Sequence, residues 1–249
     1  PFEIIAHLMV GSEGTLAFLA GVTMRTEREY EHKASAMVYF SDIGEASRAV
    51  VEMRKLQDAA GERIVHSAEM LDRKSLASVG DTTGERLTAL LTETKTHTPE
   101  ELAANVARIG ELLGRFALYV PARFTDDPAE QAKYWAVRSG IFPAVGVSRP
   151  AGTTCLSEDV AFHIEDLPRA TAELQALIAR HGYDACIYGH ALEGNYHFII
   201  NQSFSPPAEV ARYEALMNDV AELVVGRYDG SLKAEHGTGR NMAPFLRRE

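Results

Sequence analysis

The order of predicted strands and helices constrains the fold of this chain most strongly. In residues 33–124 a strand comes first, and the following helix has Asp42 as its N-cap and Glu45 in the capping-box position. A second helix begins at Thr98, with Pro99 in its first turn. The predicted strands of this half are residues 35–40, 64–71, 86–95 and 115–124. The first half therefore has the order β-α-β-β-α-β.

The same order recurs in the second half, after a linking helix predicted at residues 127–145. A strand leads into a helix with apolar residues at helical spacing, two more strands follow, and Ser205 and Pro206 open another helix. The predicted strands here are residues 155–162, 184–190, 195–204 and 231–237. Two such units predict an α+β fold of tandem ferredoxin-like β-α-β-β-α-β units with a mainly antiparallel sheet.

The composition narrows the class of protein. Apolar residues make up 46% of the chain and charged residues 24%, as in ordinary folded proteins. The net charge of −10 disfavours nucleic acid as a partner, and no apolar run approaches the ~20 residues of a transmembrane helix. Cys155 and Cys186 are isolated, which favours a reducing compartment. We therefore expect a cytoplasmic protein, which could also lie against a membrane surface.

Residues 1–30 differ in character from the rest of the chain. They are apolar and β-prone around the glycine-rich turn GSEGTL, whose backbone N–H groups could approach a phosphate or a flavin. The chain opens at Pro1 within a strand-like run of residues 1–10, and its end follows a motif without a closing element. We therefore expect it to be a piece of a longer protein.

Two histidines flank the loop of a predicted hairpin. As cross-strand neighbours, His190 and His197 would have Cβ atoms about 5 Å apart, close enough to share one metal ion. Gly189 and Gly194 can supply the unusual backbone angles that such a loop requires. On spacing alone, two surface histidines without a metal carry about the same weight.

An acidic residue and a third histidine are adjacent at the end of the last predicted strand. The side chains of Glu235 and His236 therefore begin on opposite sides of the chain. One can complete a two-histidine, one-carboxylate metal site, while the other serves as a general base.

Arg138 lies three residues after the only tryptophan, Trp135, on one face of the linking helix. A guanidinium fork beside an aromatic surface can bind a carboxylate. The alternative, a solvated helix arginine, is the commoner case.

Four segments carry a resemblance to known flavoproteins. Residues 11–26, GSEGTLAFLAGVTMRT, resemble the closing segment of the FAD-binding domain in vanillyl-alcohol-oxidase-type flavoproteins. WAVRSG, GHALEGNYH and EHGTGR resemble, in the same order, signature segments of the FAD-linked D-2-hydroxyacid dehydrogenases. That family includes D-lactate and D-2-hydroxyglutarate dehydrogenases and the glycolate oxidase D subunit. The run SLKAEHGTGRNMAPF is most similar to large bacterial members with a fused iron–sulfur region.

This resemblance implies roles at the matching positions. His236 would be the catalytic base beside a divalent metal ion, Zn, Mn or Fe. Residues 1–30 would be the C-terminal tail of an FAD-binding domain, and residues 31–249 the substrate and metal domain. The expected metal ligands are His190, His197 and Glu235, the expected substrate contacts are Arg138 and Asn195, and the residues expected near FAD are Gly11, Ser12, Glu13, Gly14 and Thr15.

The resemblance also implies a reaction. A D-2-hydroxy acid, of the D-lactate or D-2-hydroxyglutarate class, would be oxidised to the 2-oxo acid with hydride transfer to FAD. Because most of the FAD domain would lie outside the chain, the fragment alone should be inactive. An electron acceptor, such as a fused iron–sulfur region, is an expected partner. The alternatives are a non-catalytic tandem ferredoxin-like module for ligand binding or assembly, with a structural metal site, and a metal-dependent hydrolase.

Overall fold

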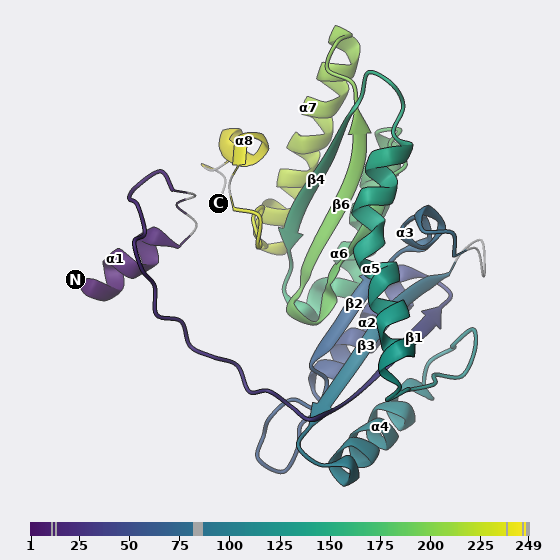
Figure 1. The fold of residues 1–249 in the computed structure, drawn as a ribbon. Helices are drawn as coiled ribbons and strands as arrows, with labels where there is room; N and C mark the ends of the chain where they lie inside the picture. Colours follow the sequence, from purple (N-terminus) through teal and green to yellow (C-terminus); the bar gives the residue numbers. More distant parts are fainter. Residues whose placement is uncertain (11, 13, 82–86, 238, 246, 248–249) are drawn as a thin grey trace.

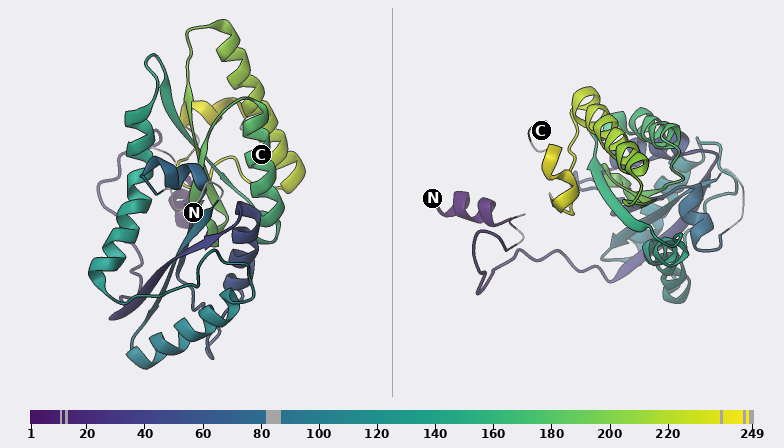
Figure 2. Two further views of the ribbon diagram at one scale, coloured as in Figure 1. Left: turned by 90° about the vertical axis from the view of Figure 1, so that its right-hand side faces the viewer. Right: turned by 90° about the horizontal axis from the view of Figure 1, so that it is seen from above.

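The computed structural model describes residues 1–249 except 11, 13, 82–86, 238, 246, 248 and 249. Residues 1–10, predicted as strand-like, form instead the helix α1 (Phe2–Met9). The prediction is wrong because an unbroken apolar run does not distinguish a strand from a helix. An extended segment then leads into the sheet, and Figures 1 and 2 show α1 set apart from the sheet. Large apolar side chains of this region, such as Phe2 and Phe18, are exposed.

One six-stranded sheet forms the centre of the fold, and each of its strand pairs is antiparallel. Its order is β1-β3-β2-β5-β6-β4, so each half contributes its first, third and second strands in the ferredoxin-like arrangement. The two halves meet where β2 pairs with β5, which confirms the predicted α+β fold of two antiparallel units. Figure 1 shows β1, β2 and β3 of the first unit and β4 and β6 of the second. The strands are β1 (His32–Phe40), β2 (Ser67–Leu71), β3 (Thr88–Thr96), β4 (Thr154–Ala161), β5 (Cys186–His190) and β6 (Asn195–Gln202).

The prediction of a fourth strand in each unit is wrong. Residues 115–124 contain one isolated bridge to β1, at Leu118. Pro121, within this run, lacks the N–H group that a strand ladder requires. Residues 231–237 likewise make one bridge to β4, at Ser231. Each segment thus lies beside the outer strand of its unit, where the fourth strand of the pattern belongs, without forming a ladder.

Four long helices cover one face of the sheet and enclose the larger core. The predicted caps are confirmed, because Asp42 accepts the backbone N–H of Glu45 at 2.8 Å and Thr98 that of Glu101 at 3.2 Å. In the described part of the chain, no helix combines the length and apolarity that crossing a bilayer requires. The four helices are α2 (Ile43–Arg54), α4 (Pro99–Leu113), α6 (Leu167–Arg180) and α7 (Pro207–Ala221), which continues into a π-helical turn, η3 (Glu222–Arg227).

The opposite face carries the linking helix α5 (Pro128–Ser148) and the short helix α3 (Arg73–Ser78). The sequence patterns predicted α5 but not α3. Figure 2 shows α5 on one side of the sheet and α2, α6 and α7 on the other. Ile141 and Val145 of α5 belong to a second, smaller core cluster on this face. The short remaining elements are η1 (Ile164–Asp166), η2 (Ala191–Glu193), α8 (Gly239–Met242) and η4 (Ala243–Phe245).

Strand alternation determines which polar side chains share the face that carries α5. Met70 and Phe198 point into the larger core, so their sequence neighbours Glu69, in β2, and His197, in β6, point to the other face. His190, at the end of β5, joins them because it pairs with Glu69. These polar residues therefore lie at the junction of the two units.

Candidate functional site

Three side chains that the sequence predicted to share a metal ion lie together at this junction. Nε2 of His197 is 2.9 Å from Oε1 of Glu235, and Nε2 of His190 is 3.4 Å from Oε2 of Glu235. One ligand atom from each residue lies within 4.8 Å of the other two. The predicted grouping therefore exists as a cluster of donor atoms.

The hairpin that carries the two histidines differs from its predicted register. Tyr188 pairs with His197 across β5 and β6, whereas His190 pairs with Glu69 across β5 and β2. The histidines are thus diagonal neighbours, with ring centroids 5.9 Å apart. Long side chains still meet across such a diagonal, so the corrected register keeps the two imidazoles together.

Two glycines permit the close approach of backbone in this hairpin, as expected. Gly189 has a φ of +151°, and a Cβ there would lie 2.5 Å from the carbonyl oxygen of Asn195. Gly194 has a φ of +76°, and a Cβ there would collide with the carbonyl oxygen of Phe162. Asn195 itself is buried at the start of β6, and its Oδ1 has no hydrogen-bond partner among the described residues.

Glu69, which the sequence analysis missed, connects His190 to Arg138. Its Oε1 is 2.7 Å from Nδ1 of His190, and its Oε2 accepts a hydrogen bond from Nε of Arg138 at 2.8 Å. Burial alone would raise the pKa of Glu69, but its contacts with His190 and Arg138 lower it. The hydrogen bond between Glu69 and His190 raises the pKa of His190. An acidic residue within the apolar run of β2 is the signal that could have identified it.

Arg138 is not a solvated helix arginine. Its side chain is only 17% exposed, and its guanidinium carbon lies 4.7 Å from the centre of the Tyr188 ring. Because the Glu69 bond uses Nε, the two terminal nitrogens remain without a hydrogen bond among the described residues. The predicted alternative is therefore wrong. The Glu69 carboxylate bridges the guanidinium and the His190 imidazole.

Asp159 of β4, also missed, holds the segment that carries Glu235 and His236. Its Oδ2 accepts the backbone N–H groups of Ala234, Glu235 and His236, at 3.2, 2.6 and 3.0 Å. This carboxylate thereby fixes an irregular segment against the sheet where a strand had been predicted. An acidic pair, Glu158 and Asp159, within a strand that has no other charged residue was the available signal.

His236 stands beside the cluster and is open to a ligand. Its ring stacks on that of His197, and its Nε2 is 3.9 Å from Oε1 of Glu235, beyond hydrogen-bond distance. Its side chain is 43% exposed, whereas that of His197 is 3% exposed. Burial and the nearby His236 lower the pKa of His197 to about 4, so His197 is neutral at pH 7.

The donor set of His190, His197 and Glu235 fits a divalent cation. Neutral imidazole nitrogens and a carboxylate are the ligands that zinc and manganese accept. A second trio, Asp159, His197 and His236, is also compact enough to hold an ion. In that trio, however, Oδ2 of Asp159 is already occupied by three backbone N–H groups. The first trio is therefore the better cation site.

The glycine-rich turn near the N-terminus is described only in part. Gly11 and Glu13 lie outside the described residues. The carbonyl oxygen of Ser12 accepts both the backbone N–H of Thr15, at 2.9 Å, and its hydroxyl, at 2.6 Å. Gly14 has a φ of +74°. Gly14 and Thr15 are exposed to solvent.

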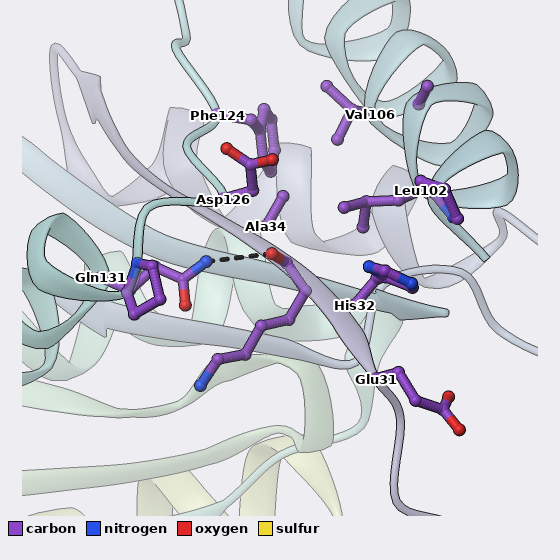
Figure 3. A pocket seen from close by; sticks show the side chains of 12 residues that line it. Glu31, His32, Ala34, Leu102, Val106, Phe124, Asp126 and Gln131 are labelled. Carbon is purple, nitrogen blue, oxygen red and sulfur yellow. Dashed lines mark hydrogen bonds between the residues drawn. The ribbon is translucent and has the colours of Figure 1, made fainter. Parts of the chain in front are cut away.

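Two cavities differ in what their walls can do. One, of about 450 Å³, lies between β1, α4 and the start of α5, and none of the clustered histidines is among its lining residues. Figure 3 shows that the side-chain amide of Gln131 bonds there to the backbone oxygen of Lys33, which ties α5 to β1. The other, of about 330 Å³, is lined by Asp159 and His236. This second cavity meets the donor cluster at His236, so of the two it is the candidate for substrate binding.

Comparison with known proteins shows the family of the chain. A family model described as FAD linked oxidases, C-terminal domain, matches residues 29–249. The glycolate oxidase subunit GlcD of Escherichia coli K12 is 28% identical over 96% of this chain and 46% of its own length. The mitochondrial D-lactate dehydrogenase (cytochrome) of Arabidopsis thaliana is 23% identical over 98% of this chain and 42% of its own length. The D-2-hydroxyglutarate dehydrogenase of Xanthomonas citri pv. viticola is 33% identical over 47% of this chain and 25% of its own length. The chain thus spans less than half the length of these relatives.

Solved structures show the same fold. An alkyldihydroxyacetonephosphate synthase superposes with a TM-score of 0.61 at 15% identity, over 91% of this chain and 44% of that one. The 4-ethylphenol oxidase of Gulosibacter chungangensis, in complex with isoeugenol, superposes with a TM-score of 0.53 at 11% identity, over 80% of this chain and 45% of that one.

Proposed function

Because the chain belongs to the FAD linked oxidases, as the C-terminal domain of that family, we propose that it binds the substrate of an oxidoreductase that converts a D-2-hydroxy acid to the 2-oxo acid. The relatives support this substrate class, since glycolate, D-lactate and D-2-hydroxyglutarate are all 2-hydroxy acids. Residues 31–249 would form the substrate domain, and residues 1–30 the tail of an FAD-binding domain. The family match, which begins at residue 29, supports that boundary.

The observation that carries the proposal is the convergence of His190, His197 and Glu235 beside an open histidine, His236. Within one small region the chain offers two imidazoles and a carboxylate for a cation, a histidine outside that set and a nearby guanidinium. A 2-hydroxy acid presents a carboxylate and an adjacent hydroxyl, which these groups complement.

Bound FAD would accept the two electrons, and a divalent cation at His190, His197 and Glu235 would supply the charge that favours ionisation of the substrate hydroxyl. His236 would take the hydroxyl proton on a ring nitrogen, since it is exposed and makes no hydrogen bond to Glu235. The terminal nitrogens of Arg138 would bind the substrate carboxylate as a fork.

The remaining assignments belong to the same proposal. Asn195 would line the substrate side of the hairpin, and the GSEGT turn would lie near FAD. An electron acceptor outside this chain would reoxidise the flavin, and the resemblance of residues 231–245 favours a fused iron–sulfur region. We expect the intact protein in the cytoplasm.

An anaerobic titration of the intact flavoprotein tests the proposal. D-lactate, glycolate and D-2-hydroxyglutarate would each be added, with L-lactate as the control, while the visible absorbance of the flavin is followed. We expect one or more of the first three acids to bleach the flavin and L-lactate to leave it oxidised.

Two other results would redirect the assignment. Cation binding without flavin reduction by any 2-hydroxy acid would favour a non-catalytic ligand-binding module. Cation-dependent hydrolysis without flavin reduction would favour a hydrolase.

A further inference from the structure

We propose that Glu69 is a positioning residue that orients the cation ligand His190 and the carboxylate-binding Arg138 at once, so that one buried carboxylate aligns the two halves of the substrate site. This inference rests on the proposed function and assigns a role to a residue outside the donor cluster itself.

The contacts of Glu69 use its two oxygens separately. Oε1 meets Nδ1 of His190 at 2.7 Å, and Oε2 meets Nε of Arg138 at 2.8 Å. Oε1 also accepts a longer hydrogen bond, 3.3 Å, from the hydroxyl of Ser67 on the same strand. The Glu69 side chain is 5% exposed, so water does not compete for either oxygen. Each partner is therefore held in one orientation.

The contact with His190 determines which ring nitrogen can bind a cation. A carboxylate that accepts from Nδ1 places the proton there and leaves the lone pair on Nε2. Nε2 of His190 is the atom that faces Glu235. Glu69 thereby directs the ligand nitrogen toward the ion site.

The contact with Arg138 determines which edge of the guanidinium is free. Because Glu69 occupies Nε, the terminal edge of Arg138 remains for an anion, and that edge suits a carboxylate. Stacking of the guanidinium on the Tyr188 ring restricts it further. The cation ligand and the anion-binding arginine therefore share one support.

The position of Glu69 explains why it can reach both partners. It lies in β2 of the first unit and pairs with His190 in β5 of the second, across the strand pair that joins the units. Arg138 comes from the helix that links the units. Glu69 thus connects the first unit, the second unit and the linking helix α5.

A carboxylate is required because both partners donate. A glutamine can accept from one donor through its oxygen, but its NH₂ group would then face the second donor. Glu69→Gln therefore keeps the size of the side chain and loses one of the two contacts. Glu69→Asp keeps the charge but shortens the side chain, so it can reach only one partner.

Glu93 offers a matched control on the neighbouring strand. It is also buried on this face of the sheet, and its Oε2 accepts from Nε1 of Trp135, one helical turn before Arg138 on α5. It has no contact with the histidine cluster among the described residues. Glu93→Gln thus disturbs the docking of α5 without touching His190 or Arg138.

The experiment compares Glu69→Gln, Glu69→Asp and Glu93→Gln in the intact flavoprotein. Zn²⁺ affinity is measured by competition with a chromophoric chelator, and KM is measured for the preferred 2-hydroxy acid and for its amide. Both Glu69 variants should bind Zn²⁺ about 10–100-fold more weakly, and they should raise KM for the acid more than for the amide. Glu93→Gln should change neither quantity more than about twofold.

The outcomes separate this inference from the function on which it rests. Wild-type Zn²⁺ affinity in all three variants, with flavin reduction intact, overturns the positioning role and leaves the proposed function standing. Failure of the unaltered protein to bind Zn²⁺ overturns the cation site and this inference together. Equal weakening by the Glu69 and Glu93 variants would show a general packing effect and also overturn the inference.

Discussion

The imidazole ring of His236 stacks on that of His197, with ring centroids 4.7 Å apart and ring planes 10° apart. The buried His197 therefore fixes the plane of the exposed His236. Glu235, the preceding residue, turns toward His190 and His197 instead. Two adjacent residues thus take separate positions, one in the donor cluster and one beside it.

Replacing His236 should separate proton transfer from cation binding. In the intact protein, His236→Ala should lower kcat by about 10²–10⁴-fold, the usual contribution of a general base, with little change in bound metal. His190→Ala should lose bound metal and activity together, because it removes a donor. Metal analysis and steady-state kinetics check both, and equal metal loss in the two variants would reverse the assignment of base and ligand.

Changing Arg138 should affect substrates according to their charge. Arg138→Lys keeps the charge but loses the fork, and Arg138→Ala loses both. Arg138→Ala should reduce kcat/KM for the acid by an amount equivalent to about 1.5–3 kcal/mol, with a smaller loss for an uncharged 2-hydroxy amide. Arg138→Lys should lie between the alanine variant and the unaltered protein. Kinetics with the acid and amide pair provide the measurement, and equal losses for both substrates would contradict a carboxylate contact.

Removing the Asp159 carboxylate should loosen the segment that carries Glu235 and His236. Asp159→Ala leaves three backbone N–H groups without their acceptor, so we expect weaker Zn²⁺ binding and lower kcat, by roughly tenfold or more. Glu158→Gln is the control, because Glu158 contacts Tyr213 and Asn241 instead. Similar Zn²⁺ affinity in both variants would argue against the anchoring role.

The buried N-cap of α3 should make stability depend on pH. Asp72 accepts the backbone N–H and the hydroxyl of Ser75, both at 2.8 Å, and burial raises its pKa from 3.8 to about 6. Because the folded state holds this proton more tightly, the associated stability is present below pH 3.8 and is lost as pH rises through 6. The loss by pH 7 corresponds to about 3 kcal/mol.

Asp72→Asn should remove this dependence, since asparagine keeps the cap without a charge. Thermal unfolding of the intact protein should show the variant gaining stability relative to wild type as pH rises from 4 to 7. Asp42→Asn, at the solvent-exposed N-cap of α2, is the control for the substitution itself. Parallel pH curves for Asp72→Asn and the unaltered protein would contradict the prediction.

The chain's local patterns determined most of its secondary structure and one group of site residues. The capped helices at Asp42 and Thr98 and the alternating strands were predictable, because caps and side-chain periodicity act over a few residues. The grouping of His190 with His197 followed from one hairpin. The apolar run at residues 1–10 was ambiguous between strand and helix, since it lacks alternation.

Only the tertiary structure decided how these elements meet. The pairing of β2 with β5 brings Glu69 to His190 across 121 positions of sequence, and Asp159 reaches the segment at Glu235 across 76. Neither contact leaves a spacing signal, because hydrogen bonds between distant segments depend on the packing of the whole sheet. Strand register was also decided there, since it places Tyr188 rather than His190 opposite His197. The sequence thus determined which residues could form a site, and the packing of the two units determined which supports hold it.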